Sequence, residues 1–170
     1  ADVGLIHEQE GDNVFSWSMG YAHPDTVTQA SEEQLFAVLA SEGADPDYIV
    51  PGQMAVLHRG ILQGSARQID ALLTIGADPD QCLPDTFEPA KLAGATPLML
   101  AAPKPELLRL LLDYGADAQA MDAQGRDQVA FLATEADAAR LRATPEDAWT
   151  IAHADALEHS VALLRAHIAD

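Results

Sequence analysis

The segments GATPLMLAA at residues 94–102 and LLRLLLDYGAD at residues 107–117 decide the fold of this chain. Thr96 is a good N-cap, and Pro97 suits the first helical position because its missing N–H would have no partner there. The residues that follow are small or apolar, so the segment predicts a short first helix with a surface that a neighbouring helix can approach closely. Prolines at positions 103 and 105 end that helix.

The second segment predicts a second helix from Glu106 to Tyr114, because its leucines recur at helical spacing. Gly115 follows as a C-cap in the left-handed conformation, which a residue with a side chain would resist. The Gly-Ala-Asp triplet at this point occurs three times, beginning at Gly43, Gly76 and Gly115, with intervals of 33 and 39 residues. A recurring interval of this size indicates one helix-turn-helix unit stacked on copies of itself.

These segments closely resemble the ankyrin repeat, with support from LH at 57–58 and DAQG at 122–125. The resemblance covers residues 31–133 and implies an all-α ankyrin-repeat solenoid of about four to five units, with short turns or hairpins and degenerate terminal caps. We expect a single domain over residues 1–170, with an N-terminal cap or degenerate unit at 1–30 and a C-terminal helical cap at 134–170. Asp127 and Gln128 replace the Thr-Pro pair in the fourth unit, so we expect its first helix to begin less firmly.

Both ends of the chain depart from the repeat. The segment 15–21 alternates aromatic and smaller residues, which indicates either a short strand or an irregular cap, and 24–30 fits a short first helix. Near the C-terminus we expect two helices, about 145–153 and 155–168, that seal the array. Trp149 is expected to anchor the core there.

The longer second interval reflects an insertion from Gln81 to Gly94. It contains Leu83 and Phe87, for which the sequence leaves two alternatives open. Long loops with apolar residues are frequently functional, so both residues are candidates for contact with a partner. Alternatively, both fold back onto the adjacent unit.

The charge is strongly acidic. The 170 residues include 27 Asp and Glu against 9 Lys and Arg, for a formal net charge of −18, and residues 1–58 contain ten acids and no Lys or Arg. This charge repels nucleic acid and anionic membranes and accelerates association with a basic partner, although an ordinary solvated acidic surface is the alternative. We therefore expect no nucleic-acid or membrane partner.

The sequence offers no established catalytic or metal motif. His159, Ser160 and Asp155 are close in sequence but not at the spacing of a triad on one helix, and His153, His159 and His167 cannot chelate from one helical face. We therefore expect no enzyme activity, no cofactor and no metal. His58 lies where the resemblance implies a structural histidine that bonds the neighbouring loop.

Localisation is expected to be cytoplasmic. The chain begins at Ala1, so either an initiator methionine was removed or a leader was cleaved, and in the second case the protein is periplasmic.

The resemblance implies a non-catalytic module that binds another protein through its concave face and inserted loop. The hypothesis from the sequence is a bacterial immunity or inhibitor protein that neutralises a basic enzyme or toxin; the alternative is an adaptor or stabilising factor for a cellular enzyme. The predicted partner-binding residues are Tyr48, Ile49, Met54, Leu62, Gln63, Cys82, Leu83, Asp85, Phe87, Lys104, Met121, Gln124 and Arg126.

Overall fold

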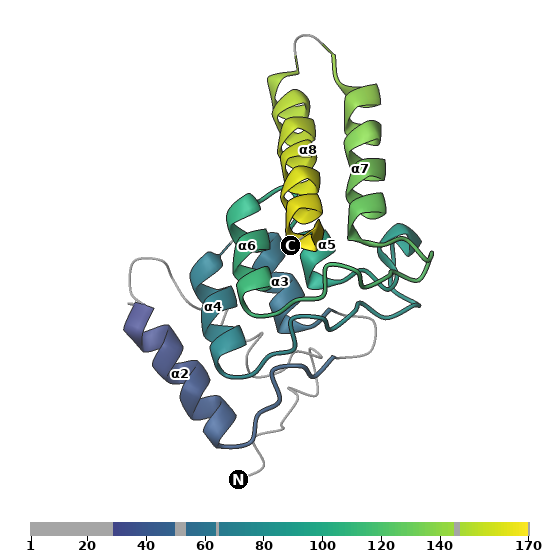
Figure 1. The fold of residues 1–170 in the computed structure, drawn as a ribbon. Coiled ribbons are helices and arrows are strands. Elements are labelled where there is room, and N and C mark those ends of the chain that lie inside the picture. The colour runs from purple at the N-terminus through teal and green to yellow at the C-terminus, as the bar shows by residue number, and fades with distance from the viewer. Residues whose placement is uncertain (1–28, 50–53, 64, 145–146, 170) are drawn as a thin grey trace.

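The computed structural model describes residues 29–49, 54–63, 65–144 and 147–169, and every regular element in those ranges is a helix. The predicted segments at 15–21 and 24–28 lie outside the described residues. The elements are α2 (Gln29–Ser41), α3 (Val56–Gln63), α4 (Ala66–Thr74), the 3-10 helix η1 (Ala90–Leu92), α5 (Pro97–Leu100), α6 (Pro105–Asp113), α7 (Gln128–Arg142) and α8 (Ala148–Ala169) (Figure 1).

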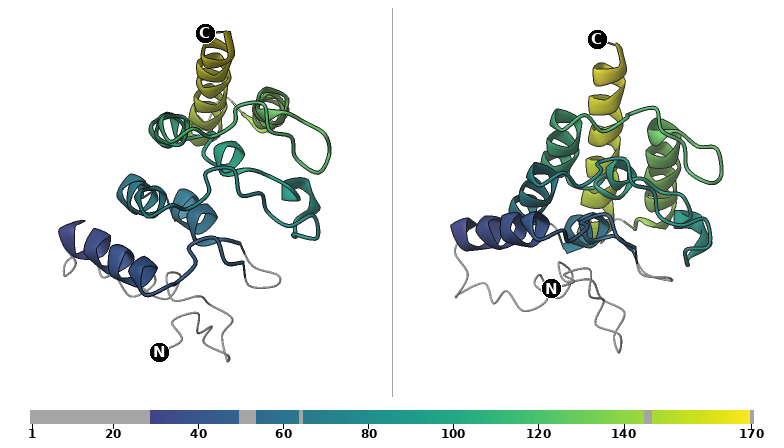
Figure 2. Two further views of the ribbon diagram at one scale, coloured as in Figure 1. Left: turned by 60° about the horizontal axis from the view of Figure 1, so that its bottom comes forward. Right: turned by 90° about the horizontal axis from the view of Figure 1, so that it is seen from below.

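The helices stack in two parallel rows. The first helices α3, α5 and α7 contact one another in sequence order, and the second helices α2, α4, α6 and α8 do the same. The pairs α3/α4, α5/α6 and α7/α8 therefore form tiers with one helix of each row, and the connecting loops project together on one side of the stack (Figure 2). This arrangement confirms the predicted all-α repeat solenoid.

The unit at residues 94–117 forms as its sequence predicts. The Thr96 hydroxyl accepts a hydrogen bond from the Met99 amide at 3.2 Å and caps α5, while Pro105 occupies the first turn of α6. Leucines at helical spacing on α6 are completely buried. Within the two rows the core is continuous, and its fully buried large side chains include Leu57, Ile61, Ile69, Leu72, Leu98, Leu107, Leu108 and Leu111.

Each Gly-Ala-Asp triplet ends a second helix in the same way. Gly43, Gly76 and Gly115 have φ angles of 91°, 100° and 88°, in the left-handed region. The alanine amide after each glycine donates back to a leucine carbonyl five residues earlier, at 3.0 Å in all three units. These contacts form the Schellman motif, and the alanine itself is buried.

The C-terminal region differs from the prediction of two cap helices. α8 is one uninterrupted helix of 22 residues, and it packs against α6 as the second helix of the fourth unit. Its partner α7 runs across the expected boundary at 133/134, and the two form a long antiparallel hairpin (Figure 1). The helix continues without interruption because the stretch 148–169 contains neither proline nor glycine to break it.

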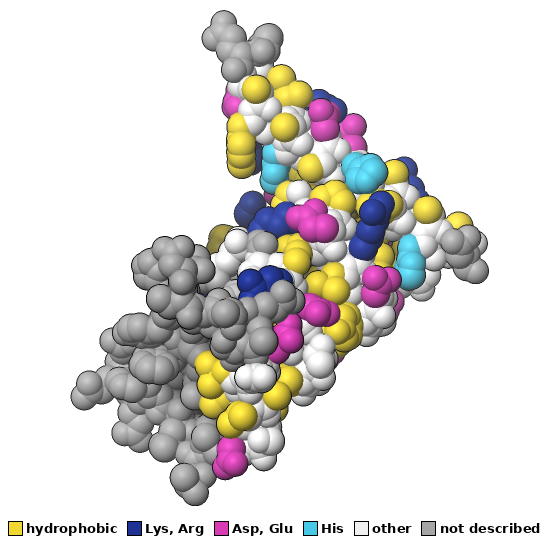
Figure 3. Space-filling view, turned by 90° about the vertical axis from the view of Figure 1, so that its left-hand side faces the viewer, with side chains coloured by type: hydrophobic (Ala, Val, Ile, Leu, Met, Phe, Trp, Pro, Cys, Tyr) yellow, Lys and Arg dark blue, Asp and Glu magenta, His cyan; other side chains and the backbone are white. Residues whose placement is uncertain are grey.

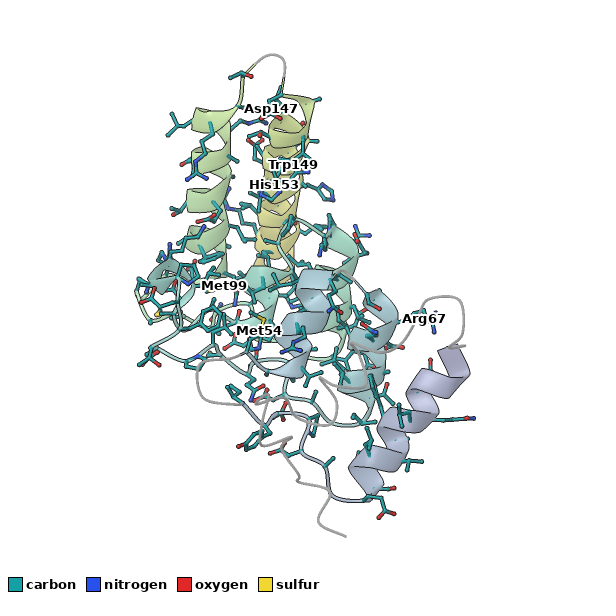
Figure 4. All side chains as sticks on the ribbon, turned by 180° about the vertical axis from the view of Figure 1, so that it is seen from behind. Met54, Arg67, Met99, Asp147, Trp149 and His153 are labelled. Atoms are coloured by element: carbon teal, nitrogen blue, oxygen red, sulfur yellow. The ribbon has the colours of Figure 1, made fainter. Side chains whose placement is uncertain are left out.

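Trp149 does not anchor the core. Its side chain is 74 % exposed and stacks on the His153 ring, with 5.2 Å between ring centroids. Asp147, Trp149 and His153 lie together near the free end of the hairpin, whereas Met99 lies inside the stack (Figure 4). The first turn of α8 extends beyond the end of α6, so no neighbouring unit covers the tryptophan (Figure 1).

The start of α7 is also firmer than expected. The Asp127 carboxylate accepts from the Ala130 amide at 2.7 Å and is an effective N-cap. Gln128 is completely buried, and its side-chain amide donates to the Thr96 hydroxyl of the preceding unit at 2.6 Å. The Asp-Gln pair thus replaces Thr-Pro with a cap and a bond between units.

His58 is completely buried on α3, so its structural position agrees with the prediction. Burial lowers the pKa of His58 to about 4, and the backbones of Gln81 and Ala95 offset part of that effect. Neither ring nitrogen makes a hydrogen bond of normal geometry with the described residues, but the ring interacts with the backbones of Gln81 and Ala95 in the neighbouring loop.

We predict that His58 makes the protein less stable in acid. The unfolded histidine titrates near 6.5 and the folded one near 4, so protonation opposes folding as pH falls through this window. The loss between pH 7.5 and pH 4 should be about 3 kcal/mol. Urea unfolding at several pH values gives the free energy of unfolding of the native protein and of His58→Gln. This free energy should depend less on pH in the variant; an equal dependence in both proteins would contradict the assignment.

A pair of glycine substitutions tests the backbone argument. At Gly76 an added Cβ meets open space, so Gly76→Ala should cost only the left-handed strain of about 1–2 kcal/mol. At Gly94, with φ of 68°, the Cβ would lie 2.4 Å from the Ala123 amide nitrogen, so Gly94→Ala should cost more. Thermal unfolding of both variants measures the difference, and equal losses would show that the close approach to Ala123 is unimportant.

Candidate protein-binding surface

The candidate surface consists of the three loops that follow the Gly-Ala-Asp triplets, residues 45–49, 78–94 and 117–126, which we call the turn edge. These loops stack beside one another on the side of the array away from α2, α4 and α6 (Figure 2). Each begins with an Asx turn, in which the triplet aspartate accepts from the amide two residues later. The three distances are 2.9, 2.9 and 2.8 Å, for Asp45, Asp78 and Asp117.

A second set of aspartates joins successive loops. The Asp47 carboxylate accepts from the Asp78 amide at 2.9 Å, and the Asp80 carboxylate accepts from the Asp117 amide at 2.8 Å. Gln119 stands at the corresponding position of the third loop. The ladder of carboxylates therefore fixes the spacing of the first three loops and stops where the fourth unit begins.

This ladder concentrates negative charge. Burial raises the pKa of Asp47 and of Asp80, and the neighbouring carboxylates raise it further, although the backbone bond from the next loop lowers it. The triplet aspartates Asp45, Asp78 and Asp117 remain exposed along the edge. The turn edge is therefore a rigid row of carboxylates rather than a diffuse acidic surface.

The insertion at 81–94 folds back as a closed loop. The Leu83 amide donates to the Ala95 carbonyl at 2.9 Å, and the Gly94 amide donates to the Leu83 carbonyl at 3.1 Å. Leu83 is 1 % exposed and Phe87 is half-buried against the core. The alternative in which Leu83 faces a partner is therefore wrong, because this leucine fills the interior of its own unit.

Arg126 binds the insertion to the fourth unit. Its guanidinium pairs with the buried Asp122 carboxylate at 2.6 Å and donates to the Lys91 carbonyl at 3.1 Å, and it lies 4.8 Å from the centre of the Phe131 ring. Gln124 donates to the Ala90 carbonyl at 3.2 Å. Both residues were predicted to bind a partner, but these contacts occupy them within the chain.

Lys104 has a similar internal role. Its ammonium group donates to the carbonyls of Ile61 at 2.7 Å and Leu62 at 3.2 Å, at the C-terminal end of α3. A cation at this position satisfies carbonyls that have no partner within the helix and complements the helix dipole. Lys104 thus caps the helix of the preceding unit, and we no longer place it among the contact residues.

The other predicted residues divide by exposure. Met121 is 65 % exposed, Leu62 53 % and Tyr48 37 %. Gln63, Cys82 and Asp85 are exposed as well, whereas Ile49 and Met54 are half-buried. Tyr48 and Met121 lie on the acidic turn edge, whereas Leu62 lies at the C-terminal end of α3. Apolar side chains beside charged ones are the combination that a protein interface needs.

Sequence reasoning missed the ladder aspartates Asp47 and Asp80. A signal was present, because Asp-Pro-Asp follows Gly-Ala in both of the first two units, at 45–47 and 78–80. It also missed Asp122, whose carboxylate is buried and accepts from the Gln124 and Arg126 amides, both at 2.9 Å. No spacing rule in a single sequence distinguishes this aspartate from its exposed neighbours.

A comparison with protein-family models matches the Ankyrin repeat at residues 93–123, the unit that contains α5 and α6. The chain contains an ankyrin repeat, and the helix pairs before and after it stack in the same two rows. Ankyrin repeats mediate binding to other proteins and are typically non-catalytic, so the stacked array is a protein-interaction module. No curated protein matches the chain. Among the helices of the described ranges, none has the length and apolarity needed to cross a membrane.

We predict that Arg126→Ala loosens the insertion. The change leaves the Asp122 carboxylate buried without its cation and removes the bond to Lys91, so the free energy of unfolding should fall by about 2 kcal/mol, less than for a fully buried pair because the guanidinium is partly exposed. Hydrogen exchange at the Leu83 and Gly94 amides should accelerate. Arg109 is exposed, so Arg109→Ala should change the free energy of unfolding by less than about 0.5 kcal/mol. Equal effects of the two substitutions would show that Arg126 does not hold the insertion in place.

Proposed function

We propose that this chain is an immunity or inhibitor protein, which binds a basic enzyme or toxin through its turn edge and neutralises it. The observation that carries the proposal is the rigid row of aspartates on that edge, together with exposed Tyr48 and Met121 in the same loops. The net charge of −18 supports a basic partner. No catalytic role for the array enters this proposal.

The electrostatics of the edge favour fast association. Among the described residues, the basic side chains of these loops are Lys91 and Arg126, which pair with Glu135 at 3.6 Å and with Asp122. No Lys or Arg of the described ranges pairs with the carboxylates of Asp78, Asp85 and Asp117. A field of one sign speeds the encounter with an oppositely charged protein, which matters for an inhibitor that must capture its target before damage is done.

The exposed apolar residues supply the buried contact that a long-lived complex needs. Solvent-exposed ion pairs contribute only about 0–1 kcal/mol each, so a lasting complex needs buried contact. Met121, in the loop before the fourth unit, and Leu62, at the end of α3, offer such contact on the first-helix side of the array. We therefore expect the aspartates to increase the association rate and the apolar side chains to slow dissociation.

The identity of the partner tests the proposal. The chain is used to capture proteins from its native source, and the captured protein is assayed with and without the chain. A basic toxic enzyme whose activity is abolished on binding is the expected result. Capture of an enzyme whose activity is preserved or enhanced would support the adaptor or stabilising role instead and would overturn the inhibitor proposal.

The kinetics test the division of roles. With the captured partner, the association rate should fall at least tenfold between about 50 mM and 500 mM salt. Asp78→Asn with Asp117→Asn should slow association while keeping both Asx turns, since asparagine still accepts the amide. Glu106→Gln with Asp113→Asn on α6 removes the same charge away from the edge and should have little effect.

Met121→Ser should mainly accelerate dissociation, because it removes apolar contact without changing charge. Leu141→Ser is the matched control, since Leu141 is 89 % exposed at the free end of the hairpin. A salt-independent association rate, or equal effects of paired variants and controls, would remove the turn edge from the interface.

A further inference from the structure

The second helices form an outer face on the side away from the turn edge, where α2, α4 and α6 lie side by side (Figure 2). Figure 3 shows the side of the molecule that is on the left in Figure 1, where α2 and α4 lie, and basic, acidic and apolar side chains alternate there. Between α2 and α4 a groove of about 330 Å³ opens to solvent. Its lining residues are Glu33, Gln34, Ala37, Asp70, Ala71, Thr74 and Ile75.

The lining combines an apolar part with two carboxylates. Ala37, Ala71 and Ile75 provide the apolar part, while Glu33 comes from α2 and Asp70 from α4. No Lys or Arg lines the groove, and Glu33 makes no ion pair with any residue that the structure describes. The volume is near the lower end of the range for ligand pockets, about 300–1,000 Å³, which suits one long side chain.

Asp70 is held in place from the neighbouring unit. The Tyr114 hydroxyl donates to Oδ1 of Asp70 at 2.8 Å and lies 2.9 Å from the Thr74 hydroxyl. Oδ2 of Asp70 has no hydrogen bond within the described ranges. Tyr114 does not line the groove, but its contacts with Asp70 and Thr74 place a 39 % exposed aromatic side chain beside two lining residues. Aromatic side chains are common at energetically important points of interfaces.

We propose that this groove is a second protein-docking site, which takes an arginine side chain of a partner protein. Its charge is complementary to a guanidinium, which would lie between Glu33 and Asp70, while the aliphatic stem would lie against Ala71 and Ile75. Arginine fits better than lysine, because its planar group can donate to carboxylates on two sides at once. The site is on the opposite side from the turn edge, so it does not depend on the function proposed above.

The test uses the full chain and a minimal probe, N-acetyl-arginine methylamide, followed by NMR. Saturable shifts should concentrate on the amides of Ala37, Ala71, Thr74 and Ile75 at millimolar probe. The norleucine analogue, which has an apolar stem without the charge, should bind at least fivefold more weakly. The lysine analogue should fall between the two.

Isosteric variants identify the groups responsible. Glu33→Gln with Asp70→Asn keeps the acceptor for Tyr114 and should weaken probe binding about tenfold, as expected for the loss of two partly exposed ion pairs. Glu106→Gln with Asp113→Asn removes equal charge from α6 outside the groove and should leave binding unchanged. Thermal unfolding of both double variants verifies that the fold is retained.

Several outcomes would overturn the proposal. Shifts of equal size around exposed carboxylates elsewhere, equal binding of the norleucine analogue, or an unaffected Glu33/Asp70 variant would each do so. If light scattering shows a dimer that dissociates in this variant, the occupant is a second copy of the chain, and the proposal of a different partner is wrong. Asp78→Asn with Asp117→Asn should not change probe binding, so this site and the turn edge can fail separately.

Discussion

The array depends on one repeated constraint: the backbone must turn left-handed at the end of each second helix. Glycine allows this turn at Gly43, Gly76 and Gly115, with φ near 90° in each. The following alanine is then buried, and the aspartate after it forms the Asx turn that opens the next loop. A residue with a side chain in place of the glycine would strain the point from which each connecting loop starts.

The same geometry creates the acidic edge. Because each triplet presents its aspartate at the same place, stacking the units brings carboxylates of successive loops together. Asp47 and Asp80 each accept a hydrogen bond from an amide of the next unit, which partly compensates for their burial and for repulsion by the triplet aspartates. The charge is thus arranged by the bonds that join the units, and any partner of this edge meets a preformed pattern.

Local sequence predicted what local interactions decide. The cap at Thr96, the two helices of its unit and the glycine turns are set by neighbouring residues, so they could be read directly. Contacts between units could not be predicted in this way. Arg126, Gln124 and Lys104 were predicted to face a partner because partners of ankyrin repeats usually contact these positions, but here they bond carbonyls of the insertion and of α3. Long polar side chains reach whichever unsatisfied group is nearest, and a single sequence does not reveal that group.

The fourth unit departs from the pattern of the first three. Gln119 replaces the ladder aspartate, and no further triplet follows it. Instead α7 and α8 lengthen to 15 and 22 residues, and Ser160 on α8 donates to the Ala102 carbonyl of the preceding unit. The buried residues of α8, Ser160 among them, lie on the face toward its neighbours, and its Asp, Glu and Arg side chains and Trp149 face solvent. One long helix thus takes the place of the two helices expected at 145–153 and 155–168, and it packs against both α6 and α7.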